Sequence, residues 1–234
     1  MSSHPFDYFR LREVRSFDEL VGTQLTDGVN ALCWPRALPG DFAEVAARLA
    51  RDEAGIHALD EAELQALPVS AAGRLAVEAM LADFRLLRDR QLDPVLNFIN
   101  GSAHDEPDAI VATDVFSWHA DRAPVPLDTY LCTYFGPCSE GLRNEDATRR
   151  VDDPATRAAL LARYGGADDD GFREFLAEHS YDLHYAAARG AQPFAFGHFN
   201  LWRIAVEYPA NPVPPCIHRA PETDPGEVRL LLIS

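Results

Sequence analysis

The second half of the chain consists of short runs of β-forming residues that proline and glycine separate. These runs lie at 94–101, 109–118, 129–135, 194–196, 201–208, 216–220 and 227–233. Breaks such as Gly136-Pro137 and Asp224-Pro225-Gly226 end them, because proline has no backbone donor for a sheet and the Pro-Gly pair favours a turn. Many short strands in succession favour a jelly-roll or another barrel.

The first 93 residues show helical spacing instead. Asp41 is a good N-cap for a helix that ends near Ala54, and Ser70 begins a longer one. Only 29–34 in this part has the composition of a short strand. The long helix carries an apolar stripe, which indicates the face that packs on the sheet. The stripe consists of Val77, Met80, Leu81, Phe84 and Leu87.

A second helical region interrupts the strands at about 139–192. One helix begins at Asp153-Pro154, where proline is tolerated in the first turn, and another begins at the acidic run 168–170. We therefore expect a single α+β domain over 1–234. Its mainly helical part is 1–93, and its core at 94–234 is a cupin-like jelly-roll with a helical insertion that could form a lid.

The charge balance restricts the partners of the chain. Lys and Arg number 21 and Asp and Glu 37 among 234 residues, so the net charge is −16. Such a chain repels nucleic acid and anionic membranes, which bind clustered Lys and Arg. Hydrophobic residues make up 47% of the sequence, which is typical of a globular protein.

The cysteines and the N-terminus indicate a cytoplasmic protein. The four cysteines form no C-x-x-C pair, so we interpret them as reduced thiols. The first residues lack the basic and apolar regions of a signal peptide. No apolar run approaches the length of a membrane span.

Two short segments about a hundred residues apart carry the candidate chemistry. His119 and Asp121 form an H-x-D pair at the end of a β-type run, so an extended backbone would place both side chains on one face. His218 lies in a later run, and Arg229 follows it in the last one. Two imidazoles and one carboxylate can bind one face of a ferrous ion and leave other positions open.

Other residues compete for these roles or add to them. His179, His184 and His198 are alternative distal ligands, of which His198 is the strongest because it follows a β-type run. We prefer His218, since Arg229 then lies one hairpin away on a neighbouring strand. A buried arginine in an apolar strand needs either an internal acid or an anionic ligand. Thr129 and Tyr130 could add hydroxyl hydrogen bonds to the same ligand.

The order H-x-D, His and Arg resembles the Fe(II)/2-oxoglutarate-dependent dioxygenases over residues 95–234. The resemblance implies a double-stranded β-helix in which His119, Asp121 and His218 bind iron. It also implies that Arg229 binds the distal carboxylate of 2-oxoglutarate and that O₂ is a substrate. Leu231 departs from the pattern, because some branches carry serine two residues after this arginine.

Three functions remain open on the sequence. The first is a 2-oxoglutarate-dependent oxygenase that acts on a small molecule such as an amino acid or a natural-product intermediate. The second is a cupin-type metalloenzyme without 2-oxoglutarate, in which Arg229 pairs with an internal acid. The third is a jelly-roll protein that binds a metal or ligand without catalysis. The sequence leaves the oligomeric state open.

Overall fold

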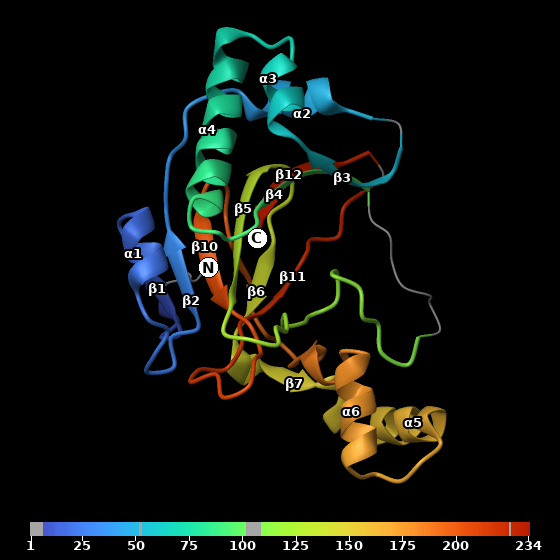
Figure 1. The fold of residues 1–234 in the computed structure, drawn as a ribbon. Helices are drawn as coiled ribbons and strands as arrows, with labels where there is room; N and C mark the ends of the chain where they lie inside the picture. The colour runs from blue at the N-terminus through green and yellow to red at the C-terminus, as the bar shows by residue number, and fades with distance from the viewer. Residues whose placement is uncertain (1–6, 52, 102–108, 225) are drawn as a thin grey trace.

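The computed structural model describes residues 7–51, 53–101, 109–224 and 226–234 of an α+β protein (Figure 1). Its centre is a seven-stranded mixed sheet in the order β1-β2-β10-β5-β12-β4-β3. Only β1 and β2 pair in parallel within this sheet. The strands are β1 (Leu11–Glu13), β2 (Ala31–Trp34), β3 (Gly55–Leu59), β4 (Val95–Asn100), β5 (Asp128–Phe135), β10 (Leu201–Ala205) and β12 (Val228–Ile233).

Two smaller sheets complete the β-structure of the described residues. One has the order β11-β6-β9, and the other pairs β7 with β8. Their strands are β6 (Glu140–Leu142), β7 (Ala147–Arg149), β8 (Tyr185–Ala187), β9 (Phe194–Ala195) and β11 (Ile217–Arg219). The α+β class is as predicted. Within the described residues no sheet closes into a barrel, and the jelly-roll core stays a prediction.

The two faces of the large sheet pack in different hydrophobic cores, because successive side chains along a strand point to opposite faces. On β5 and β12, Tyr130, Cys132, Tyr134, Leu230 and Leu232 are buried in the main core, which the helices complete. The residues between them turn to the opposite face. There Leu131 and Leu231 pack with aromatic side chains of β9, β10 and the loop between these strands, which are Phe194, Phe196 and Trp202.

The N-terminal helices supply the first of these cores. They are α1 (Phe17–Gly22), α2 (Phe42–Leu49), α3 (Glu61–Ala66) and α4 (Ala71–Arg88). The predicted N-caps are confirmed, since Asp41 accepts a hydrogen bond from Glu44 N and Ser70 accepts one from Gly73 N. The predicted stripe on α4 is buried in the core, except for the partly buried Phe84.

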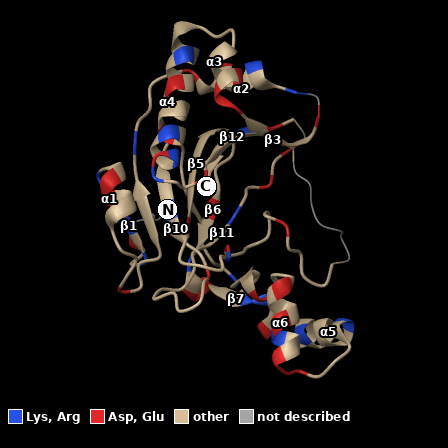
Figure 2. Ribbon diagram, in the orientation of Figure 1, with Lys and Arg blue, Asp and Glu red and all other residues tan. Residues whose placement is uncertain are grey.

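The second helical region has its own hydrophobic cluster. It contains α5 (Pro154–Tyr164) and α6 (Asp170–Glu178), and Figure 1 shows both away from α2–α4. Leu160, Phe172 and Leu176 are buried between them. Figure 2 shows both basic and acidic residues in this region, and Arg157 of α5 pairs with Asp168 in the connection that precedes α6. Two short 3₁₀ helices, at Arg150–Asp152 and Tyr181–Leu183, contact α5 and α6, and a third at Asn144–Asp146 contacts the N-terminal part of the chain.

Two sequence-based boundaries differ from the structure. The described part of the run 109–118 contains no strand, because Asp114 accepts hydrogen bonds from the backbone of Phe116 and Ser117 and so forms a turn. The interrupting region also contains strands, since β6 at its start pairs with β11. The helices α5 and α6 therefore occupy only part of the predicted insertion.

In the described part of the chain, no helix is both long enough and apolar enough to cross a membrane.

A buried ion pair joins the helices to the large sheet. Asp83 of α4 accepts hydrogen bonds from Arg36 Nη2 at 2.8 Å and from the Tyr134 hydroxyl at 2.7 Å. Asp83→Ala should therefore lower the free energy of unfolding by about 3–5 kcal/mol, because it leaves a buried guanidinium without its counter-charge. Urea denaturation measures this loss. Arg173→Ala, which breaks the exposed pair with Asp170, should leave the midpoint unchanged. Equal midpoints for the two variants would contradict the assignment.

Candidate metal centre

His119 and His218 lie opposite each other on paired backbone segments. His119 N donates to His218 O at 2.9 Å, and His218 N donates to His119 O at 2.9 Å. Directly opposed residues of an antiparallel pair have side chains on the same face. The two imidazole rings accordingly lie 4.5 Å apart between centroids.

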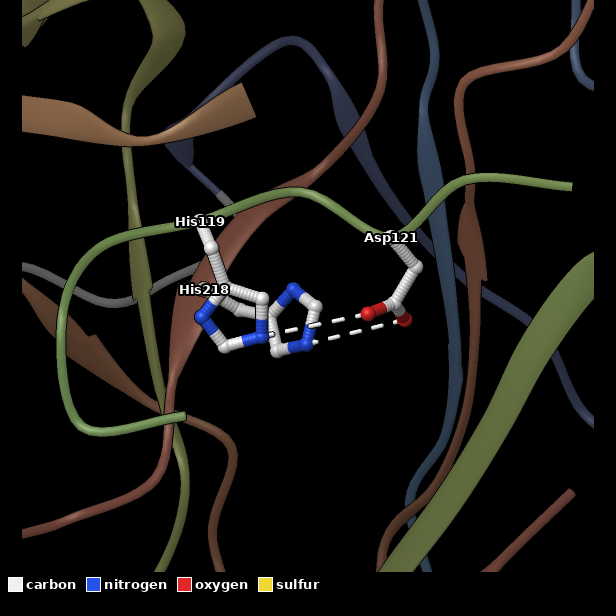
Figure 3. Close-up of side chains that lie close together, drawn as sticks. All are labelled: His119, Asp121 and His218. Atoms are coloured by element: carbon white, nitrogen blue, oxygen red, sulfur yellow. Dashed lines mark ion pairs between the residues drawn. The ribbon is translucent and has the colours of Figure 1, made fainter. Parts of the chain in front are cut away.

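Asp121 completes a cluster of three convergent side chains. Glu207 N donates to the backbone oxygen of Asp121 at 2.8 Å and fixes the chain just after the His119 segment. The carboxylate oxygens of Asp121 lie 3.8 Å from His119 Nε2 and 3.8 Å from His218 Nε2. Figure 3 shows the three side chains pointing toward one another, and one ligand atom from each lies within 4.8 Å of the others.

Backbone carbonyls orient both imidazoles. His119 Nδ1 lies 2.8 Å from Ser117 O, and His218 Nδ1 lies 3.2 Å from Cys216 O. Because a carbonyl oxygen only accepts, each Nδ1 carries a proton, and in the neutral ring Nε2 keeps its lone pair. Both lone pairs are then available on the side of Asp121, as in metal sites whose histidines are held by an outer hydrogen bond.

The electrostatics of the cluster favour a metal-binding protonation state. Burial, with repulsion from His218, lowers the pKa of His119 to about 4. Burial raises the pKa of Asp121, but attraction to His218, the hydrogen bond from Thr129 and attraction to His119 outweigh it, so this pKa lies below its usual value. Near neutral pH the site therefore offers a neutral His119 and an ionised Asp121, the forms that bind a cation.

Thr129 contacts Asp121 directly. Its hydroxyl donates to Asp121 Oδ2 at 2.6 Å from the first part of β5. A carboxylate held in this way keeps one orientation and a lower pKa. Thr129 was predicted to contact a bound cosubstrate, and the structure places it against the candidate metal ligand instead.

Arg229 and the three candidate ligands line the same cavity, whose volume is about 180 Å³. Arg229 is buried, and its guanidinium donates from Nε to Pro137 O at 2.8 Å and from Nη2 to Ser139 Oγ at 3.1 Å. No carboxylate of the described residues pairs with it. Burial lowers the pKa of Arg229 to about 10, which leaves it positively charged at neutral pH.

The structure contradicts two sequence-based placements, those of Tyr130 and Arg229, and it places the alternative ligand His198 outside the cluster. Tyr130 does not reach the cavity, because it follows Thr129 on β5 and therefore faces the helical core. His198 lies outside the cluster, where its Nε2 contacts Gly136 O at 2.7 Å, so the structure brings His218 to the site. Arg229 was expected on a strand neighbouring that of His218. The strands β11 and β12 instead belong to different sheets, which meet at the cavity.

Sequence reasoning missed several residues near the site. Ser139 and Asn97 line the cavity, and Asn97 is recognisable only as a polar residue between Leu96 and Phe98 of a strand. The ring of His184 lies 5.8 Å from that of His119, beside the cluster of three ligand atoms. His184 was considered as an alternative distal ligand, although its place in the predicted helical insertion argued against its convergence on the site.

We find no match to the chain among family models, curated proteins or solved structures. The chemistry of the site therefore follows from its geometry. Two imidazole nitrogens and a carboxylate suit Fe(II), and the same donors also bind Zn²⁺. Three protein ligands leave coordination positions for exogenous molecules.

The convergence of these side chains predicts one divalent metal site per chain. His119→Ala, Asp121→Ala and His218→Ala should each weaken Fe(II) binding by at least about 100-fold, since each removes a ligand. Anaerobic calorimetric titration measures this. His179→Ala changes an exposed histidine outside the cluster and serves as the control. Loss of binding in the control, or its retention in all three ligand variants, would contradict the site.

The Thr129 hydrogen bond predicts a smaller effect on the same titration. Thr129→Val keeps the side-chain shape but removes the donor to Asp121, and we expect metal affinity to fall by about 10–100-fold. Unchanged affinity would show that Thr129 does not position the ligand.

Proposed function

We propose that the protein is a non-heme Fe(II)/2-oxoglutarate-dependent dioxygenase that oxidises a small molecule. The observation that carries this proposal is the buried Arg229, which has no described acid partner and shares a cavity with His119, Asp121 and His218. A buried cation without a counter-ion is expensive unless an anionic ligand binds it. A dicarboxylate can supply this counter-ion with one carboxylate and bind the metal with its other end.

The order of the strands supports a double-stranded β-helix. Between β4 and β12 the chain visits the large sheet at β4, β5, β10 and β12, which are neighbours in the order β10-β5-β12-β4. The chain visits the smaller sheet at 118–120, β6, β9 and β11. This sheet has the order β11-β6-β9, and the His119 segment pairs with β11 at His218, so the four segments are neighbours. Eight segments divided in this way between two facing layers fit a jelly-roll with the metal ligands on the smaller layer.

The protein residues have distinct parts in this function. His119, Asp121 and His218 would hold Fe(II), which supplies the redox chemistry for O₂ to oxidise a C–H bond while 2-oxoglutarate is converted to succinate and CO₂. Thr129 orients the carboxylate ligand. Arg229, anchored by Pro137 and Ser139, fixes one end of the cosubstrate through its charge and its planar donors.

The apolar part of the cavity wall excludes water and so supports cosubstrate binding by Arg229. Leu131 and Leu231 lie between the metal end and the Arg229 end of the cavity and are both buried. Water exclusion strengthens the attraction between Arg229 and a bound carboxylate, because the local dielectric constant is low. The cupin-type alternative requires an acid paired with Arg229, and the contacts of the described residues favour the oxygenase.

Anaerobic titration of the Fe(II) protein with 2-oxoglutarate tests the proposal. Chelation of iron by the cosubstrate should produce a visible charge-transfer absorption, which His119→Ala abolishes. Arg229→Met should weaken 2-oxoglutarate binding by about 10–100-fold, the loss expected for a charge-assisted hydrogen-bonding partner. Its affinity for Fe(II) should stay near that of the wild type, because Arg229 is not a ligand.

The controls separate the cosubstrate site from general damage to the fold. Arg173→Met removes an exposed guanidinium and should leave both affinities unchanged. Circular dichroism of Arg229→Met verifies that the variant is folded. Wild-type protein that binds Fe(II) without any 2-oxoglutarate-dependent absorption would refute the oxygenase and leave the metal site standing.

A further inference from the structure

The cavity has two sides that differ in chemistry. The head of Arg229 turns toward the connection between β5 and β6, where it contacts Pro137 and Ser139. Thr129 and Asp121 lie at the other end of β5. A cosubstrate that spans from the metal ligands to Arg229 therefore follows β5 and β12, and leaves the side formed by β4 and β3 for another molecule.

That second side is apolar and reaches the protein surface. Ile99 of β4 and Ile56 of β3 are paired in register, and Val115 lines the same cavity. Ile56 is 68% exposed, Val115 50% and Ile233 37%, although all three line the cavity. Large exposed apolar side chains that gather at one cavity mark a binding surface more than the same residues scattered singly.

One polar group lies within this apolar side. Asn97 is only 7% exposed, lines the cavity, and donates a single long hydrogen bond of 3.4 Å from Nδ2 to Val95 O. Its Oδ1 accepts no hydrogen bond from the described residues. This oxygen is not among the fully buried side-chain atoms without a partner, so it remains accessible from the cavity and can accept a hydrogen bond from a ligand.

The size of the cavity places the substrate at the apolar mouth. Its volume is about 180 Å³, close to a cavity of roughly 150 Å³ that holds one benzene molecule. A cosubstrate bound to Arg229 would fill most of this space. The second molecule must then pack largely against the exposed side chains of Ile56, Val115 and Ile233.

The charges of the lining exclude most ionic substrates. Among the described residues that line the cavity, Arg229 is the only Lys or Arg, and Asp121 is the only acid. The proposed function engages both. Neither a carboxylate nor an ammonium group of a substrate would find a counter-charge on the β4–β3 side, and the net charge of −16 further repels anions.

We infer that the primary substrate is an uncharged, largely aliphatic small molecule that packs on Ile56, Ile99 and Val115 and donates a hydrogen bond to Asn97. This inference rests on the proposed function, because it assigns Arg229 to the cosubstrate. It replaces the expected amino acid, whose two charged groups have no partner on this side of the cavity.

Binding of 1-hexanol to the metal-free protein, measured by saturation-transfer NMR titration, tests the apolar surface. The wild type should bind this probe, and Ile56→Asp should weaken binding by about 10-fold or more because a carboxylate then lies at the mouth. Ile56 is exposed, so the variant should fold. Leu75→Asp changes another exposed apolar residue, which lies on α4 outside this cavity, and should bind as the wild type does. No binding to the wild type, or equal binding to Ile56→Asp, would overturn the inference.

Hexanoate, which has the same number of carbon atoms as the alcohol but a charged head group, tests the charge preference. In Arg229→Met, 1-hexanol should bind more tightly than hexanoate, since no other Lys or Arg lines the described cavity. Equal or tighter binding of hexanoate would overturn the assignment to an uncharged substrate. Neither titration contains metal or 2-oxoglutarate, so failure here is distinguishable from failure of the proposed dioxygenase in the iron titration.

Discussion

Two reciprocal backbone hydrogen bonds between His119 and His218 hold the candidate site together. They join segments a hundred residues apart and place both imidazoles on one face of the smaller sheet. Asp121 reaches the same point because it lies two residues beyond His119 and is fixed by Glu207. The carbonyls of Ser117 and Cys216 then determine which ring nitrogens are free to bind. Backbone geometry therefore brings the three side chains together.

The strand β5 connects this site to the stability of the fold. Its alternate residues serve two purposes, since Thr129 holds Asp121 while Tyr134 donates to Asp83 of α4 on the opposite face. The helical core keeps β5 in register with β12, and this register brings Arg229 to the cavity. Damage to the buried ion pair of Asp83 and Arg36 should thus disturb the site indirectly, although neither residue lines it.

Local signals in the sequence were sufficient for much of the fold. Asp41 and Ser70 cap helices as predicted, because capping depends on a few neighbouring residues. The H-x-D pair and His218 converge as their spacing suggested, although the run before His119 forms no strand. The prediction that Tyr130 faces the site was wrong. Both faces of β5 carry apolar residues, so the alternation of side chains does not indicate which face forms the site.

Long-range features were harder to predict. The pairing of β11 with β6, and not with β12, depends on contacts between distant segments that no local pattern encodes. Asp114 turns the chain where β-forming residues predicted a strand, because its side chain competes for backbone donors. Asn97 gave a weak signal, since a single polar residue in a strand is as easily explained by an edge position.

The central claim is that His119, Asp121 and His218 bind one divalent metal through the two Nε2 atoms and a carboxylate oxygen. Anomalous X-ray diffraction from crystals grown with Fe(II) under anaerobic conditions tests it most directly. We expect one strong anomalous peak about 2.0–2.2 Å from each of these three atoms, on the cavity side that Arg229 also lines. A peak elsewhere, or binding through Nδ1 of either histidine, would contradict it.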